Sequence, residues 1–339
     1  MALVLILMIV FISGCLTADQ EEQPQQQQEI IPNQEQLQTP ELIPKLTIMG
    51  PPGPLSVPLA YMVENDKLAH IAEETDLIIW KNLDQLRVII AGQEGDFVIM
   101  PSNLAAMFYN KEMGVQLLDI SIWNAFHIIS SNPDIDSIED LKGETIAMPH
   151  KGGMPDIIFR YISERQGIDV DTDLTINYAI NPAHAARLLM EGNVNHAFIP
   201  EPLATTAIMR GKGRFHRVID VSKEWKNVAE GGARTPIAGT VALSAMQNNP
   251  EAIKAFQSEF RLAIDWMLEN PNDAGILAEK KIGFNATAVS KSTANIEWEF
   301  VTAKNAREDL EVFFGIMHNF SPKSIGGKIL GDGFFHEGV

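Results

Sequence analysis

After residue 44, short apolar runs alternate with stretches whose apolar residues recur with the period of a helix. Strands are predicted at residues 46–49, 76–80 and 97–100, the last leading into a helix from Leu104. The segment between the first two runs carries Leu59, Met62 and Leu68 at helical spacing and therefore predicts a helix. Strands that alternate with helices in this way are typical of βαβ units around a mainly parallel sheet.

The same alternation of predicted strands and helices occurs again further along the chain. Residues 145–148 and 196–199 predict strands, each followed by a Gly- or Pro-rich loop and a helix, the first of them from Asp156. Turns of this kind bring helix N-termini, with free backbone N–H groups, to one edge of a sheet, where they favour an anion. The last third of the chain predicts helices, the first with Asn249 as N-cap before Pro250.

The N-terminal end has a different pattern. Residues 2–12 form an unbroken apolar run, and Ile12, Ser13 and Gly14 stand directly before Cys15. This order resembles the lipobox of a bacterial-type lipoprotein signal peptide, so residues 1–14 are expected to be a signal peptide and Cys15 to carry lipid. No Lys or Arg precedes Cys15, and the alternative is that the run begins a buried helix with a core cysteine.

Residues 15–45 are rich in Gln, Glu and Pro and hold few apolar side chains. Such a composition buries too little surface to offset the entropy of ordering the chain, so this segment is predicted to be a disordered tether. Together with a lipid on Cys15, it predicts an extracytoplasmic protein that is anchored to a membrane and free to meet a membrane partner.

Composition narrows the class of the remaining chain. Its 339 residues suggest about two domains, and 45% hydrophobic with 21% charged residues is near the globular average. The formal charge of −18 argues against an electrostatic hold on nucleic acid. Because Cys15 is the only cysteine, no internal disulfide is possible. We expect a monomer stabilised by packing.

Residues 96–106, with Tyr109, Asn110 and Lys111 after them, resemble the ABC-transporter substrate-binding proteins of the nitrate/sulfonate/taurine group. Further matches, in the family's order, are residues 48–54, 137–143, 200–205 and 249–251. The resemblance runs from Leu46 to the C-terminus. It implies an α/β, two-lobed periplasmic-binding-protein type II fold with two hinge crossovers, here residues 121–127 and 236–241.

Carried onto this chain, the resemblance places the first lobe at residues 46–123 plus 239–339 and the second at 124–238. It implies that one small molecule is held in the cleft between the lobes and delivered to an ABC permease and its ATPase, which sense the closed form. The ligand-binding residues expected from it are Gly53, Pro54, Ser56, Ser102, Asn103, Trp123, His150, Gly152, Gly153, Met154 and Glu201.

Several of these residues have a structural alternative. Ser102 and Asn103 suit an N-cap, Glu201 suits a helix dipole, and the two glycines suit a tight turn. Trp123 suits a core position equally well, and His150 and Lys151 suit an exposed loop in which they are only solvated. The helix-starting turns and Lys151 favour an anionic ligand. Met49, Met154 and Trp123 equally suit an apolar or aromatic ring. The ligand therefore stays open between a sulfonate-, nitrate- or taurine-like anion and a small heterocycle.

The sequence indicates no catalytic group, metal site or cofactor. It contains no P-loop, no Gly-x-Ser-x-Gly elbow and no His-Glu-x-x-His helix, and its 8 histidines lack metal-ligand spacing. A pyrimidine-synthase-like enzyme of the same fold is a weak alternative, because the cysteine-rich motif of that family is missing. A lipoprotein that reports its ligand to a sensor is the other alternative.

Overall fold

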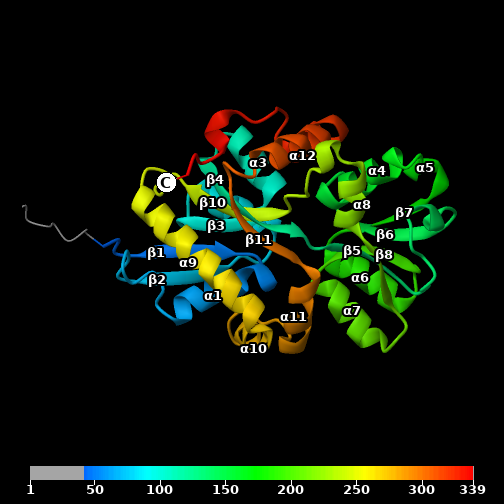
Figure 1. Ribbon diagram of the computed structural model, residues 1–339, viewed down its shortest axis with the longest axis horizontal. Helices are drawn as coiled ribbons and strands as arrows, with labels where there is room; N and C mark the ends of the chain where they lie inside the picture. The colour runs from blue at the N-terminus through cyan, green and yellow to red at the C-terminus, as the bar shows by residue number, and fades with distance from the viewer. Residues whose placement is uncertain (1–41, 339) are drawn as a thin grey trace, which may run out of the picture. The chain divides into compact units, whose positions relative to one another are not determined.

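The computed structural model describes residues 42–338, which contain two separate β-sheets (Figure 1). The six-stranded sheet has the order β11-β4-β10-β3-β1-β2. Its strands are β1 (Leu46–Gly50), β2 (Thr75–Ile79), β3 (Phe97–Pro101), β4 (Val115–Asn124), β10 (Ala238–Leu243) and β11 (Glu297–Thr302). The three strands β1, β2 and β3 are parallel, whereas β10 runs antiparallel to both β3 and β4.

The five-stranded sheet repeats this arrangement in the order β7-β6-β8-β5-β9. Its strands are β5 (Phe126–Ser130), β6 (Thr145–Pro149), β7 (Thr175–Ala179), β8 (His196–Pro200) and β9 (His216–Asp220). Strand β6 is parallel to both β7 and β8, and β5 is antiparallel to β8 and β9. We call the six-stranded sheet and its helices the first lobe and the five-stranded sheet and its helices the second lobe; the predicted two-lobed α/β fold is confirmed.

Helices pack on both sheets. The first lobe carries α1 (Val57–Glu64), α2 (Leu83–Gly92), α3 (Ser102–Asn110), α9 (Pro250–Glu269), α10 (Pro271–Lys281), α11 (Ala286–Ser292) and α12 (Arg307–Phe320). The second lobe carries α4 (Met154–Arg165), α5 (Val170–Asp173), α6 (Pro182–Glu191), α7 (Leu203–Gly211) and α8 (Val221–Val228). Asn249 is the N-cap of α9, as predicted, and its Oδ1 accepts a hydrogen bond from the Ala252 N–H at 3.1 Å.

Two of the predicted helix starts are two residues late. Helix α3 begins at Ser102, directly after β3, and α4 begins at Met154. Pro155 occupies the first turn of α4, where a proline needs no hydrogen-bond donor and its fixed φ suits the helix. Both helices therefore start within the turns that the sequence assigned to the ligand.

The chain passes between the lobes twice, from β4 to β5 and from α8 to β10. The two connections are bonded to each other: the Ile237 N–H donates to the Ile122 carbonyl at 2.9 Å. The Thr235 hydroxyl donates to the Trp123 carbonyl at 2.5 Å. These contacts join the predicted crossovers into one short two-stranded connection.

Helix α12 also spans the two lobes, although its sequence range was assigned to the first. Its Phe313 packs edge-on against Trp225 of α8, with ring centres 5.3 Å apart. Phe320 at its end meets Tyr161 of α4, with ring centres 6.3 Å apart. In Figure 1 the helix lies above β4 and β10 and reaches α8.

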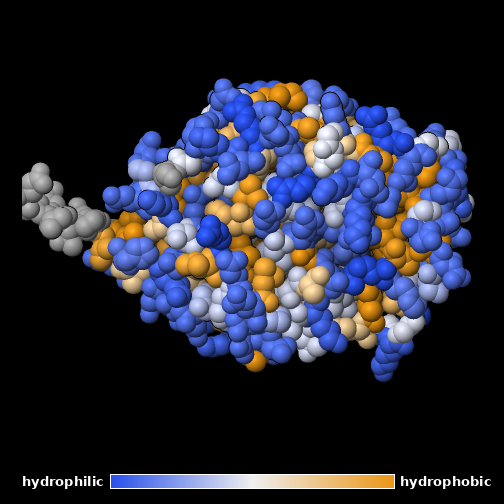
Figure 2. All heavy atoms as spheres, in the orientation of Figure 1, coloured by the Kyte–Doolittle hydropathy of each residue, from blue (hydrophilic) through white to orange (hydrophobic). Residues whose placement is uncertain are grey.

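The predicted signal peptide, the lipidation site Cys15 and most of the predicted tether lie outside the described residues. Ile43 already pairs with Ala72, so the folded chain begins before the expected boundary at residue 46. Across residues 42–338, no helix combines the length and the apolar character needed to cross a membrane. Figure 2 shows that polar side chains cover most of the visible face.

Candidate functional site

The first βα turn of the first lobe lies against the turn between β8 and α7 of the second lobe. A Cβ added to Gly53 would lie 3.8 Å from Cδ of Pro202. Gly53 has φ 129°, a conformation that side-chain-bearing residues rarely adopt, and Pro54 then starts a short 3-10 turn. Ser56 is fully buried and its hydroxyl donates to the Pro51 carbonyl at 2.6 Å.

Ser102 and Asn103 stand at the start of α3, but neither caps it. The N-cap position is Pro101, and no side chain there bonds the free N–H groups. The buried Ser102 hydroxyl instead donates to the Pro236 carbonyl on the second crossover. Asn103 Nδ2 donates to the Ser324 carbonyl at 3.2 Å. Both side chains thus bind neighbouring segments of the first lobe and its crossover.

The third predicted turn, residues 150–154, is shaped by Asp156 one turn into α4. Asp156 Oδ2 accepts a hydrogen bond from the Gly152 N–H at 2.7 Å, and its Oδ1 lies 3.1 Å from Arg160 Nε. A Cβ on Gly153 would lie 2.9 Å from the His150 carbonyl oxygen, so only glycine fits without a shift. Met154 packs in the core.

Burial lowers the pKa of His150 in this turn, because a charged imidazole is poorly solvated there. Lys151 lies over the Tyr178 ring, 5.0 Å from its centre. The Tyr178 hydroxyl is 3.1 Å from Asp156 Oδ1. The turn is therefore held by a network of side chains, and its backbone is the part proposed below to meet a ligand.

The Glu201 carboxylate contacts three other residues. It is fully buried, and its Oε2 accepts a hydrogen bond from the Thr205 N–H at 3.0 Å in the first turn of α7. Its Oε1 pairs with Arg217 of β9 and lies 3.9 Å from Nε2 of His127 on β5. Glu201 thus serves as a partner of the helix dipole, the structural alternative weighed for it, with a protein cation beside it.

Trp123 is fully buried on the first crossover. Its Nε1–H donates to the Glu299 carbonyl at 2.9 Å, and the guanidinium of Arg234 covers its ring at 3.5 Å from the centre. The faces of this ring are therefore taken by the protein itself. Within the structure Trp123 fills the core role that the sequence left as its alternative.

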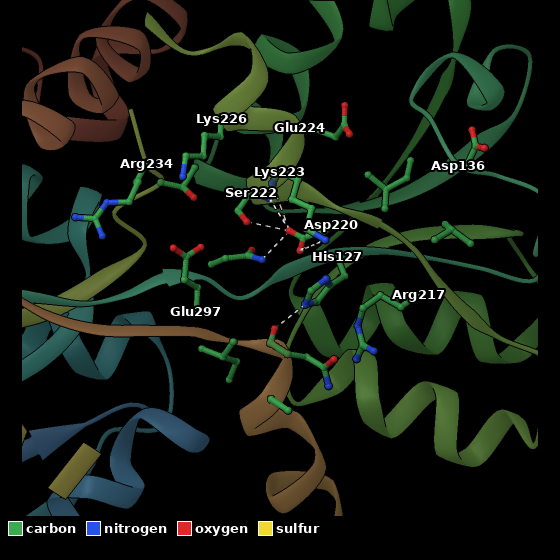
Figure 3. Close-up of a pocket in the computed structure, with 17 residues that line it drawn as sticks. His127, Asp136, Arg217, Asp220, Ser222, Lys223, Glu224, Lys226, Arg234 and Glu297 are labelled. Carbon is green, nitrogen blue, oxygen red and sulfur yellow. Dashed lines mark hydrogen bonds and ion pairs between the residues drawn. The ribbon is translucent and has the colours of Figure 1, made fainter. Parts of the chain in front are cut away.

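A cavity of about 740 Å³ lies where the edge strands β9 and β11 of the two sheets approach each other (Figure 3). Its walls come from both lobes and both crossovers. Residues that line it are Asn124, His127, Asp136, Arg217, Val218, Ile219, Asp220, Ser222, Lys223, Glu224, Lys226, Arg234, Thr235, Ala294, Asn295, Ile296 and Glu297. None of the eleven residues expected to bind the ligand is among them.

The lining mixes four basic with four acidic side chains, so its charge selects no one class of ion. Asp220 organises one wall as the N-cap of α8: its Oδ1 accepts from the Ser222 N–H at 3.1 Å and from Asn124 Nδ2 at 2.9 Å. Asp220 follows the apolar pair Val218 and Ile219 and precedes a helix, and an aspartate in that position is the sequence signal that would have found this wall. Within residues 42–338, no group of three or more His, Cys, Asp or Glu side chains is placed to hold a metal.

The sequence profile of the NMT1-like family matches residues 106–280, just over half of the chain. The protein belongs to the NMT1-like family. The matched part of this family member runs from α3 through the second lobe to α10. Among curated protein sequences no match was found.

Solved structures share the whole fold of this NMT1-like protein at low sequence identity. An ABC transporter protein from Parabacteroides distasonis is 21% identical with a TM-score of 0.73, over 87% of this chain and 99% of that one. The periplasmic aliphatic sulphonate-binding protein SsuA from Escherichia coli is 16% identical with a TM-score of 0.68, over 87% and 94% of the two chains. The periplasmic nitrate-binding protein NrtA from Synechocystis PCC 6803 is 12% identical with a TM-score of 0.62, over 83% and 84%. Family and fold confirm the group predicted from residues 96–111.

Proposed function

We propose that this NMT1-like protein is an extracytoplasmic solute-binding protein that captures a small molecule and delivers it to an ABC importer. The observation that carries the proposal is the pair of opposed turns at Gly53 and Pro202, one on each lobe, on a fold whose chain passes between the lobes through two bonded crossovers. A ligand that touches both turns stabilises the closed arrangement, and closure is the signal that a permease recognises.

The proposed binding surface is the backbone of four turns, at residues 53–56, 102–103, 150–154 and 201. Helices α3, α4 and α7 start at these turns. The Ser102 and Thr205 N–H groups donate to Ile237 and Glu201, and the other first-turn N–H groups are the proposed donors to the ligand. Most polar side chains there already have protein partners, which favours a ligand held by main-chain donors. Of the eleven residues expected to bind the ligand, the ten that stand in these turns remain the proposed contacts, whereas the buried Trp123 is a core residue. The proposed ligand is a small anion or a small heterocycle.

The proposed location rests on the sequence. A lipid on Cys15, followed by the Gln-rich segment 15–45, would keep a monomeric binding body beside the permease and its ATPase. Permease and ATPase genes next to this one would favour delivery to an importer, whereas a neighbouring sensor gene would favour signalling. No catalytic step is part of the proposal.

Thermal unfolding of the purified chain with a panel of ligands tests the proposal. The panel holds sulfonates, nitrate, bicarbonate, pyrimidines, flavins and aromatic carboxylates. A ligand at a hundred times its Kd should raise the unfolding free energy by about 2.7 kcal/mol. If no member of the panel shifts the transition and the neighbouring genes encode no permease, the importer function is rejected.

A further inference from the structure

His127 makes a direct hydrogen bond from the second lobe to the first. It lies on β5, and its Nε2 is 2.8 Å from the carbonyl oxygen of Asn295, in the turn after α11 (Figure 3). Only 3% of the imidazole is exposed, although it lines the cavity between the edge strands. If the lobes separate at this junction, the bond is lost and the ring meets water.

The bond requires one tautomer. A carbonyl oxygen only accepts, so Nε2 carries the hydrogen and Nδ1 presents a lone pair. Nδ1 is buried and has no hydrogen-bond partner among the described residues. A second proton on Nδ1 would therefore create a buried N–H group without an acceptor, which costs free energy in the closed arrangement.

Charged groups around the ring do not remove that cost. Glu201, at the end of β8, attracts a proton, but Arg217 on β9 pairs with it and repels one. Asp220, also on β9, is engaged with Asn124 and lies 3.8 Å from Lys223 of α8. From the first lobe the neighbours are the uncharged Asn295 and, across the cavity, Glu297 of β11. Burial outweighs the attraction, so the pKa of His127 lies below its usual value.

We propose that His127 is a pH-sensitive latch between the two lobes, which holds them closed when neutral and releases them when protonated. The proposal rests on the proposed function, because it assumes that the lobes open and close. In the open arrangement the ring is solvated and titrates near its ordinary pKa of about 6.5.

The direction of the effect follows from linkage. The closed arrangement binds the proton more weakly than the open one, so acid shifts the equilibrium toward the open form. Above pH of about 6.5 the ring is neutral in both arrangements and closure is unaffected by pH. Below that value the ratio of closed to open molecules falls by up to about tenfold per pH unit, until the closed form is protonated as well.

Other groups that titrate in this range do not face the lobe junction in the same way. Asp119 is buried between β4 and β10 of the first lobe, and His196 lies 3.5 Å from Glu144 within the second. Burial also lowers the pKa of His336, whose backbone N–H donates to the Leu117 carbonyl at 2.9 Å within the first lobe. None of these three environments changes when rigid lobes rotate. His150, in the third predicted turn, is the remaining candidate and enters the test as a separate variant.

Small-angle X-ray scattering of the full chain from pH 8 to pH 5, at constant ionic strength, tests the latch without any ligand. Variants are His127→Gln, which keeps an amide donor near Nε2 but cannot titrate, the exposed control His70→Gln, and His150→Gln. The radius of gyration of the wild type and of His70→Gln should rise in acid, while that of His127→Gln stays constant. Circular dichroism at each pH establishes that the chain is folded.

Three outcomes overturn the latch: a constant radius in the wild type, the same acid expansion in His127→Gln, or an expansion that is lost only in His150→Gln. If His127→Gln does not fold, nitrogen NMR of the wild-type imidazole replaces it, and a Nδ1–H tautomer at pH 8 also overturns the proposal. Because no ligand is used, these failures leave solute capture itself untouched.

Discussion

The guanidinium of Arg234 lies 3.5 Å from the centre of the Trp123 ring, so one crossover rests on the other. Arg234 also pairs with Glu299 of β11 and with Asp309 of α12, where Nε is 3.2 Å from Oδ2. One side chain therefore ties the second crossover to the first, to the edge of the six-stranded sheet and to the helix that spans both lobes.

Replacing Arg234 should lower the unfolding free energy more than the loss of an exposed ion pair does. Arg234→Ala removes the contact with the ring and leaves the partly buried Asp309 with the backbone N–H of residue 234 but without its cation, for an expected loss of about 2 kcal/mol. Arg234→Lys keeps the charge without the planar guanidinium, so its unfolding free energy should lie between those of the wild type and Arg234→Ala. Urea unfolding measures the loss, with Arg87→Ala as the control at about 0.5 kcal/mol or less. Equal losses for Arg234→Ala and Arg87→Ala would contradict this account of the hinge.

Asp119 should make stability fall as the pH rises toward neutrality. Burial raises its pKa to about 7, whereas an unfolded aspartate titrates near 3.9. Between these values the folded chain holds a proton that the unfolded chain releases, so the unfolding free energy drops by about 1.4 kcal/mol per pH unit. Asp119→Asn cannot ionise and should remove this part of the pH dependence. Denaturant unfolding from pH 4 to pH 8 gives the difference between the two chains, and a constant difference would refute the assignment.

The turn at residues 150–154 should respond to a single added methyl group. Gly153→Ala places a Cβ 2.9 Å from the His150 carbonyl oxygen, so the turn must shift, and binding of the ligand found by thermal unfolding should weaken about tenfold or more. Gly315→Ala is the matched control, because a Cβ there meets no atom within 4 Å on α12. Calorimetric titration compares the two. Unchanged affinity in Gly153→Ala would remove this turn from the site.

The anchor can be tested apart from the folded body. Cys15→Ser should abolish labelling by a fatty-acid analogue and release the protein from membranes, because no other cysteine is present. The thermal transition of the body should not change if residues 15–45 are the disordered tether that the sequence predicts. Membrane retention of Cys15→Ser would instead indicate that the apolar run of residues 2–12 itself holds the chain.

Strands β1, β2, β3, β6 and β8 were predictable because each contains a run of apolar residues. Strands β7, β9 and β11 were not predicted, and β11 lies in the part of the chain that was expected to be helical. The partners of the site residues were not predictable, because they come from distant parts of the chain. Ser102 bonds to Pro236, 134 residues away, and nothing around Ser102 signals that partner. Likewise, the pairing of Glu201 with Arg217 depends on two strands meeting at one end of a sheet.

The cavity between β9 and β11 was missed for a related reason. Its walls are edge strands that approach each other only through the relative placement of the lobes, and the crossover residues Asn124 and His127 were considered only as hinge. The crossovers themselves were predictable, since the resemblance placed one at residues 121–127 and the other close to Thr235.

Native mass spectrometry of the chain as purified from cells tests the central claim, capture of a small molecule, most directly. The account predicts one bound small molecule per chain, whose mass disappears on unfolding and whose readdition restores a saturable thermal shift. A bare chain that gains no shift from any compound of the panel would contradict it.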